Sequence, residues 1–241
     1  MKFSIITCTR NNSKWLPKHI ESVNNQTYKN FEHIIIDDAS TDNSIDVLKN
    51  SVFTCDTKVY ARREQAFAVK NHLFGMKHAT GDVIVHLDGD DWFYDNNVLS
   101  YLKQQYEEHD CWATYGSWVH FDSTISWHMP PFPSKSAKDI RANKLWSFTH
   151  LRSFKKDLIS VIPAMDIVDA VGDLHKYSAD VVLLTSVYEY ALHKNKLLYV
   201  KNPLVVYNSN TGFNDHSSAP SGQYNTSMQV FNSPYSILNI I

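Results

Sequence analysis

Three aspartates fall within four residues at Asp88-Gly89-Asp90-Asp91, directly after the apolar run Val83–Leu87. Carboxylates this close repel one another, which raises their pKa values or strains the loop unless a cation lies among them. Hard oxygen ligands suit Mg²⁺ or Mn²⁺, and substrate phosphate oxygens often complete the coordination. Gly89 permits a tight turn that directs neighbouring carboxylates to one centre. The position after an apolar strand favours a cation site over the alternative, a solvated acidic turn at the start of a helix.

A second acidic pair, Asp37-Asp38, ends the apolar run His33–Ile36. One of these carboxylates could accept a hydrogen bond from the imide N–H of uracil, a donor that cytosine lacks. The alternative is a helix start, where the helix dipole favours an acidic side chain. The polar turn Thr9-Arg10-Asn11 follows the first strand-like run. The planar Arg10 guanidinium either stacks on a base or lies in solvent.

Two basic residues are candidates for binding a phosphate or a metal. Lys70 lies on a predicted helix before the Asp88 strand, where it either reaches a phosphate or points into solvent. His216, in the polar stretch Asn214–Ser218, is a candidate for a further metal ligand. The sequence has no HExxH motif, P-loop or GxGxxG motif, so zinc hydrolysis is not indicated and a bound diphosphate would require a metal to neutralise it.

Alternating strand and helix patterns must position these residues. Strand-like runs end near Thr7, Ile36 and Leu87. In the segments between these runs, and in the segment from Leu87 to Tyr106, apolar residues recur at the spacing of a helix. Such alternation predicts a mainly parallel, doubly wound α/β sheet. Because ligands bind at the carboxyl ends of parallel strands, the three polar strand ends should share one crevice.

The second half of the chain is less regular. Met129–Pro133 contains three prolines and predicts a rigid loop. Apolar spacing predicts a helix after Asp180, and residues 197–200 and 204–207 predict two strands. Residues from about 209 onward are rich in Asn, Ser, Gly and Pro, which predicts a mobile tail or lid. The apolar ending, 237–241, either docks on the body, binds another subunit as in a homo-oligomer, or marks a cut from a longer chain with further domains.

Composition excludes some classes of partner. The formal net charge is −2 and there is no basic run, whereas nucleic-acid binding requires clustered Lys and Arg. Three scattered cysteines predict free thiols in a reducing compartment. No apolar stretch approaches the ~20 residues that a transmembrane helix needs. We therefore expect a cytoplasmic protein with no transmembrane segment and no nucleic-acid partner.

The N-terminal motifs resemble those of the family 2 glycosyltransferases, which have the GT-A fold. Residues 4–11 are similar to that family's first strand and its Thr-Tyr-Asn turn, 34–42 to its uridine-binding strand end, and 78–91 to its approach to the DxD motif. Together they cover residues 3 to about 107 in the family's order. The second half matches loosely through 148–150, 177–180 and 205–207. Arg10, Gln65 and Lys70 depart from the family's usual tyrosine, glycine and arginine.

This resemblance implies roles for particular side chains. Asp38 would contact the base, Asp88 with Asp90 or Asp91 would hold the ribose and the metal, and Asp180 would be the base that activates the acceptor. It also implies inversion at the anomeric carbon. From the local sequence alone, Asp180 is equally an N-cap residue of the following helix. The fallback candidates for the base are Asp166, Asp169 and Asp173.

The sequence therefore predicts one GT-A-like domain over residues 1–241, with a nucleotide-sugar-binding half (about 1–110), an acceptor-side half (about 111–208) and a tail or lid (about 209–241). The expected reaction is metal-dependent, inverting transfer from a UDP-sugar to a hydroxyl of a carbohydrate or glycoconjugate, with Mn²⁺ or Mg²⁺ as cofactor. The alternatives are a sugar-phosphate nucleotidyltransferase and a non-catalytic nucleotide-sugar-binding module. The predicted donor-binding residues are Thr9, Arg10, Asn11, Asp38, Lys70, Asp88, Gly89 and Asp90, and the predicted metal ligands are Asp90, Asp91 and His216.

Overall fold

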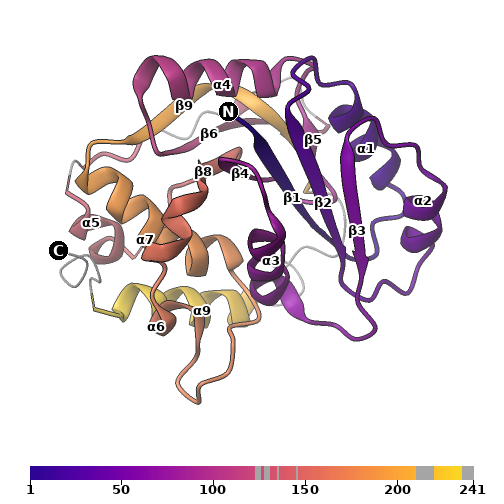
Figure 1. Ribbon diagram of the computed structural model, residues 1–241. Coiled ribbons are helices and arrows are strands. Elements are labelled where there is room, and N and C mark those ends of the chain that lie inside the picture. Colours follow the sequence, from indigo (N-terminus) through magenta and orange to yellow (C-terminus); the bar gives the residue numbers. More distant parts are fainter. Residues whose placement is uncertain (123–125, 128–130, 135, 145, 210–219, 235–241) are drawn as a thin grey trace.

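The three strand-like runs of the first half and the more polar segment 56–61 form four parallel strands in the computed structural model, which describes residues 1–122, 126–127, 131–134, 136–144, 146–209 and 220–234. These strands are β1 (Phe3–Thr9), β2 (Phe31–Asp37), β3 (Asp56–Ala61) and β4 (Val83–His86). They lie in the order β3-β2-β1-β4, and every neighbouring pair is parallel. The expected parallel sheet is therefore present in this half (Figure 1).

The helices between these strands cover both faces of the sheet. α1 (Leu16–Asn24) and α2 (Ser44–Asn50) pack on one face together with α4 (Val98–His109), and α3 (Phe67–His78) packs on the other. α2 begins at Ser44, with Asn43 at its N-cap position. The Asp37 carboxylate accepts hydrogen bonds from the backbone N–H and the hydroxyl of Ser40, which holds this segment in a turn.

The second half adds antiparallel strands, so the whole sheet is mixed. β8 (Arg152–Lys155) lies antiparallel between β4 and β6 (Ala113–His120), and the order continues through β9 (Leu197–Tyr207) to the short β5 (Trp92–Phe93). β7 (Ser126–Trp127) pairs with β6. The prediction of two strands separated at 201–203 is wrong, because β9 is one continuous strand. Its pairing with β6 shifts register between Gly116 and Trp118, so the residues around Pro203 fall outside the regular ladder.

A helical layer completes the second half. It comprises α5 (Lys138–Ala142), the 3₁₀ helix η1 (Lys156–Val161), α6 (Ala164–Ile167), α7 (Ala179–His193) and α9 (Pro220–Asn232). α7 is the helix predicted after Asp180, and it is buried along most of its length. Residues 131–134 lie outside helices and strands, as expected, whereas 129–130 lie outside the described residues.

The expectation of a mobile tail is wrong for residues 220–232, because they form α9 and pack against α5, α6 and α7 (Figure 1). Val230 and Phe231 are buried in the main core. The Arg141 guanidinium donates to the Val230 carbonyl, to Asp166 and to Glu189, which joins α9 to its neighbours. The apolar ending 237–241 lies outside the described residues.

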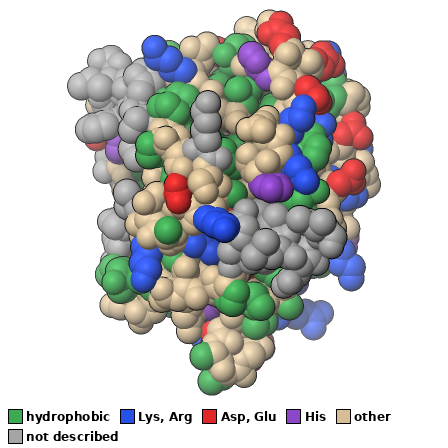
Figure 2. All heavy atoms as spheres, turned by 90° about the vertical axis from the view of Figure 1, so that its left-hand side faces the viewer, with side chains coloured by type: hydrophobic (Ala, Val, Ile, Leu, Met, Phe, Trp, Pro, Cys, Tyr) green, Lys and Arg blue, Asp and Glu red, His purple; other side chains and the backbone are tan. Residues whose placement is uncertain are grey.

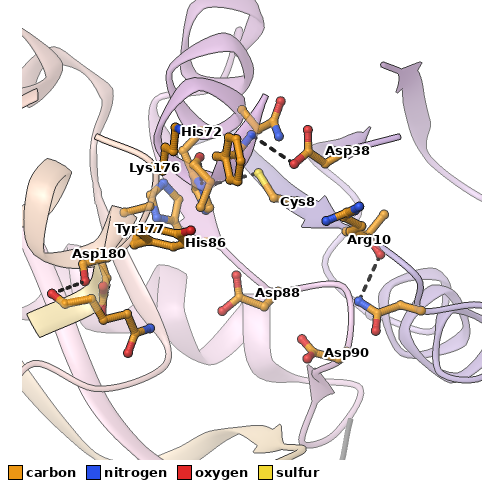
Figure 3. Close-up of a pocket in the computed structure, with 18 of the residues that line it drawn as sticks. Cys8, Arg10, Asp38, His72, His86, Asp88, Asp90, Lys176, Tyr177 and Asp180 are labelled. Atoms are coloured by element: carbon orange, nitrogen blue, oxygen red, sulfur yellow. Dashed lines mark hydrogen bonds between the residues drawn. The ribbon is translucent and has the colours of Figure 1, made fainter. Parts of the chain in front are cut away.

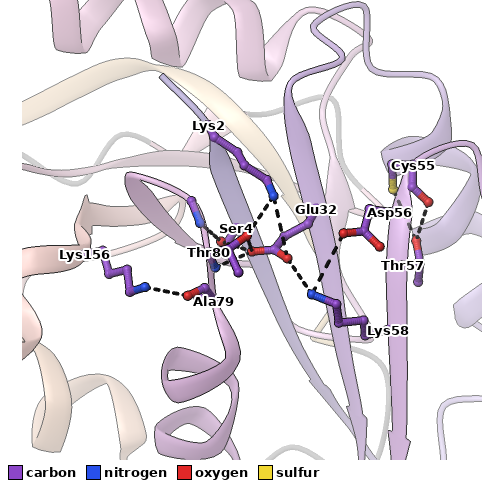
Figure 4. Close-up of polar contacts among 11 residues, drawn as sticks. Lys2, Ser4, Glu32, Cys55, Asp56, Thr57, Lys58, Ala79, Thr80 and Lys156 are labelled. Atoms are coloured by element: carbon purple, nitrogen blue, oxygen red, sulfur yellow. Dashed lines mark hydrogen bonds and ion pairs between the residues drawn. The ribbon is translucent and has the colours of Figure 1, made fainter.

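A polar network holds the amino-terminal edge of the sheet (Figure 4). The fully buried Glu32 carboxylate accepts hydrogen bonds from the Ser4 hydroxyl (2.6 Å) and the Thr80 backbone N–H (2.5 Å), and Lys58 pairs with it at 3.0 Å. Burial raises the pKa of Glu32, but these partners outweigh burial and lower it to about 2. The network ties β1, β2 and β3 together at the edge opposite the polar strand ends.

None of the described helices is both long and apolar enough to cross a membrane. The face shown in Figure 2 carries basic and acidic side chains interspersed with hydrophobic ones. This mixture agrees with the small formal net charge of −2.

Candidate functional site

A cavity of about 550 Å³ lies at the carboxyl ends of β1, β2 and β4. One side of the cavity is lined by residues that end or follow these strands, namely 8–12, 38, 86, 88 and 90. The other side is lined by residues 176–180, which lead into α7, and by Gln223 of α9. Figure 3 shows Asp38 and Asp180 on opposite sides of the cavity, with Asp88 between them. The strand ends that the sequence analysis singled out therefore face one space, and the second half of the chain closes it.

The acidic loop after β4 brings two of its carboxylates toward His150. The His150 Nε2 atom lies 3.5 Å from Asp88 Oδ2 and 4.0 Å from Asp91 Oδ2. The Asp91 backbone N–H donates to the Asp88 carbonyl at 3.0 Å, so these residues occupy the first and last positions of a tight turn. That turn places their side chains together, whereas Asp90 lines the cavity separately.

Asp91 is fully buried, and its two carboxylate oxygens have different surroundings. Oδ1 accepts the Asn208 backbone N–H at 2.8 Å. Oδ2 has no hydrogen-bond partner among the described residues. Burial, followed by the nearby charges of Asp90 and Asp88, raises the pKa of Asp91. A buried carboxylate oxygen without a partner is costly, and a cation would remove that cost.

Arg152 supplies positive charge at the centre of the site. Its guanidinium lies 2.6 Å from His150 Nε2, donates to Asp180 Oδ2 at 2.7 Å and lies 3.6 Å from Asp88 Oδ2. Burial would raise the pKa of Asp88, but the hydrogen bond from His150 and the charge of Arg152 lower it. Neither His150 nor Arg152 was predicted from the sequence to be a functional residue. The signal it contained was the loose family match at 148–150.

The residues present fit a divalent cation. Asp88, Asp91 and His150 each offer a ligand atom, and these atoms lie within 4.8 Å of one another. Two carboxylates and one imidazole form a donor set that suits Mn²⁺ and related ions. Of the predicted ligands, Asp91 belongs to this group, Asp90 does not, and His216 lies outside the described residues.

The turn after β1 is built around close backbone packing. A Cβ atom on Gly89 would lie 2.5 Å from the Thr9 side chain, so glycine allows the acidic loop to lie directly on the end of β1. The Asn11 side chain accepts the Thr41 backbone N–H at 2.8 Å and so holds the neighbouring loop. Arg10 is exposed and lines the cavity.

Asp38 lines the cavity and also caps a helix. Its two carboxylate oxygens accept the backbone N–H groups of Ala66 (2.6 Å) and Phe67 (3.0 Å) at the start of α3. The capped helix is α3, which follows β3, and not the next helix in sequence, as the alternative interpretation had it. Lys70 is exposed and is not among the cavity-lining residues, whereas Lys176 lines the cavity.

Asp180 lies in the first turn of α7 and faces the cavity, with its side chain 30% exposed. Ser178 occupies the N-cap position, so Asp180 is not the N-cap residue. The fallback candidates lie elsewhere. Asp166 is fully buried and pairs with Arg141, Asp169 accepts backbone N–H groups of its own loop, and Asp173 also lies outside the cavity lining.

Comparison with known proteins indicates the family of this chain. Residues 4–168 match the model of the family described as glycosyl transferase family 2. An uncharacterized glycosyltransferase of Rickettsia felis is 38% identical over 105 residues, covering 42% of this chain and 17% of the relative. Glycosyltransferase GlyG of Streptococcus pneumoniae is 29% identical over 122 residues, covering 50% of this chain and 40% of the relative. The chain therefore spans less than half the length of either relative.

Solved structures share the fold. TarS 1–349 of S. aureus, in complex with UDP-GlcNAc, superposes with a TM-score of 0.67 at 18% identity, covering 91% of this chain and 61% of that chain. Mannosyltransferase PcManGT from Pyrobaculum calidifontis, in complex with GDP-Man and Mn²⁺, superposes with a TM-score of 0.55 at 14% identity, covering 84% and 55%. With its mixed α/β sheet of GT-A type and a family match over residues 4–168, the chain belongs to glycosyl transferase family 2.

Proposed function

We propose that this chain is a metal-dependent, inverting glycosyltransferase that moves a sugar from a UDP-sugar to a hydroxyl of a carbohydrate or glycoconjugate. One observation carries the proposal: Asp88 and His150 of the convergent group line the same cavity as the carboxylate of Asp180, and the buried Asp91 lies next to them. Sugar transfer needs a group that offsets negative charge on the leaving diphosphate and a group that accepts the proton of the acceptor hydroxyl.

The donor would lie along the ends of β1, β2 and β4. Asp38 lies at one end of this surface, where its carboxylate could accept the uracil imide hydrogen, and Arg10 lies at the rim. A divalent cation held by Asp88, Asp91 and His150 would offset the charge of the departing diphosphate. TarS, which shares the fold, has been solved with UDP and with UDP-GlcNAc, and PcManGT with GDP-Man and Mn²⁺. These complexes support a nucleotide-sugar donor.

The acceptor would approach from the side of α7. Its hydroxyl oxygen forms a bond to the anomeric carbon while the bond from that carbon to the diphosphate oxygen breaks, so that UDP departs and the configuration inverts. The proton of the hydroxyl passes to the Asp180 carboxylate. Arg152 holds that carboxylate in place through the 2.7 Å contact. The carboxylates of Asp88 and Asp91 would already be engaged on the leaving-group side.

Calorimetry of UDP binding tests the donor half of this proposal. Wild-type protein should bind UDP much more tightly with Mn²⁺ than with EDTA, and Asp91→Asn should remove most of that difference. Asp110→Asn is a matched control, because Asp110 is 72% exposed and pairs with Lys196 away from the cavity. Equal affinity of the wild type for UDP with and without metal would exclude the metal role.

Product analysis tests the reaction itself. A panel of UDP-sugars, with GDP-mannose for comparison, should identify a donor from which the protein slowly releases free UDP. Pyrophosphate release from UTP and a sugar 1-phosphate would instead identify a nucleotidyltransferase. Binding without any turnover, in the presence of candidate glycan acceptors, would identify a binding module.

A further inference from the structure

Three fully buried polar side chains lie beneath the acidic loop. Thr7 on β1, His19 on α1 and His33 on β2 are each 0% exposed. The Thr7 hydroxyl oxygen lies 3.2 Å from His19 Nε2 and 3.0 Å from His33 Nε2, and the two imidazole nitrogens lie 3.4 Å apart. The other ring nitrogen of His19, Nδ1, lies 2.7 Å from the Asp91 backbone carbonyl. These side chains therefore connect two strands and a helix to a residue of the candidate metal group.

One direction of the hydrogen bonds satisfies all three contacts between Thr7, His19 and Asp91 and between Thr7 and His33, and it leaves only His33 Nδ1 without a partner among the described residues. A carbonyl only accepts, so His19 Nδ1 must carry the hydrogen that it donates to Asp91. Both rings are fully buried, which disfavours a charged imidazole, so each ring carries one hydrogen and His19 Nε2 is an acceptor. The Thr7 hydroxyl then donates to His19 Nε2 and accepts from His33 Nε2–H. The reverse order would leave the buried His19 Nε2 atom without a donor.

The network supplies one of the two hydrogen bonds that fix Asp91 to elements outside its own turn. His19 holds its backbone carbonyl, and the Asn208 backbone N–H holds Oδ1. Only Oδ2 is left without a partner among the described residues, and it lies 4.0 Å from His150 Nε2. The two hydrogen bonds come from α1 and from the residue after β9, so the orientation of Asp91 is set by elements far apart in the sequence.

We propose that His19, oriented by Thr7 and His33, is a positioning residue that fixes the Asp91 carboxylate for cation binding. This inference rests on the proposed function, because it assigns the network a role in the proposed metal site. Hydrogen-bonding partners behind a metal ligand typically change metal affinity by about 10- to 100-fold when they are removed. A purely structural network would lower stability and leave metal affinity unchanged.

A pair of substitutions at one position separates these roles. In His19→Asn, the side-chain amide nitrogen can occupy the place of Nδ1 and still donate to the Asp91 carbonyl. In His19→Gln, the amide lies farther out, near the place of Nε2, and that donor is lost. Calorimetry with Mn²⁺ and UDP should show affinity for Mn²⁺ weakened about tenfold or more in His19→Gln and close to wild type in His19→Asn.

Two substitutions on β1 form a second matched pair. Thr7→Val removes the hydroxyl of the network, and Ser4→Ala removes an equally buried hydroxyl that bonds to Glu32 at the other edge of the sheet. Thr7→Val should weaken Mn²⁺ binding, while Ser4→Ala should lower only the melting temperature. Equal Mn²⁺ affinities for His19→Asn and His19→Gln, or an equal loss in Ser4→Ala, would overturn the positioning role.

Backbone hydrogen exchange gives a readout that does not depend on a bound metal. His19→Gln should speed exchange of the Asp91 amide, which donates to the Asp88 carbonyl in the turn, by about tenfold or more, and Ser4→Ala should leave it unchanged. If the wild type binds no Mn²⁺, the metal role in the proposed function is wrong, and the exchange rate of the Asp91 amide alone tests whether His19 positions Asp91. Unchanged exchange in His19→Gln would then overturn the inference.

Discussion

Replacing Arg152 by methionine tests how the charge of the site is balanced. Methionine keeps most of the buried stem and removes the guanidinium, whose neighbours include Asp180, His150 and Asp88. Without it, the carboxylates at this end of the cavity lose the cation that lies among them. The folded state should therefore be less stable when no metal is bound, since like charges at close range repel one another.

The expected loss of stability in Arg152→Met depends on how exposed the charged side chains are. Removing one partner of a buried ion pair typically costs about 3–5 kcal/mol. The Arg152 side chain is 8% exposed, but Asp88 and Asp180 are 35% and 30% exposed, so water screens their charges. We therefore expect a loss at the lower end, about 3 kcal/mol in the free energy of unfolding. A more negative site should also bind Mn²⁺ more tightly, so at the same Mn²⁺ concentration the variant should gain more stability than the wild type. A protein at a Mn²⁺ concentration of 100 times its Kd gains about 2.7 kcal/mol.

Urea unfolding of both proteins, with EDTA and with Mn²⁺, measures these quantities. Lys155→Met is a matched control on the same strand, because Lys155 is 39% exposed and its contact with Asp110 is 4.0 Å long. That substitution should change stability by no more than about 0.5 kcal/mol. An Arg152→Met protein as stable as the wild type in EDTA would refute the reasoning, as would a variant that gains no more from Mn²⁺ than the wild type does.

Three further outcomes are expected. Asp180→Asn should leave UDP and metal binding near wild type and lower turnover by a factor of ~10² or more, so rapid transfer by this variant would place the base elsewhere. Asp38→Ala should lower the free energy of unfolding by about 1–3 kcal/mol, since α3 loses its cap, and should abolish the preference for UDP over CDP; a stability loss with unchanged preference would leave Asp38 as a cap only. Glu32 has a pKa of about 2 in the folded state, below its ordinary value of 4.5, so its stabilisation is fully present above pH 4.5 and is lost as the pH falls toward 2. Glu32→Gln should be less stable than the wild type at pH 7, by at most about 3 kcal/mol, and should lose less stability on acidification; parallel pH–stability curves for the two proteins would contradict this assignment.

The first half of the fold could be predicted from local patterns. Continuous apolar runs such as His33–Ile36 predict strands covered on both faces, and the structure has β2 fully buried there. A parallel strand must be followed by a crossover, which accounts for the helices at 67–78 and 98–109. β8 could not be predicted in this way, because a four-residue antiparallel strand with the sequence Arg-Ser-Phe-Lys has no apolar run of its own.

The candidate site could likewise be predicted only in part from the sequence. The sequence alone determined that Asp38 and the acidic loop would face one crevice, because the carboxyl ends of parallel strands meet at one edge of a sheet. Only the tertiary structure decided which partners those residues have. His150 and Arg152 reach the site because β8 inserts beside β4, and His19 reaches the Asp91 carbonyl because α1 packs under the loop. Periodicity in a sequence reports which side of an element is buried, whereas distances between side chains of different elements depend on how those elements pack.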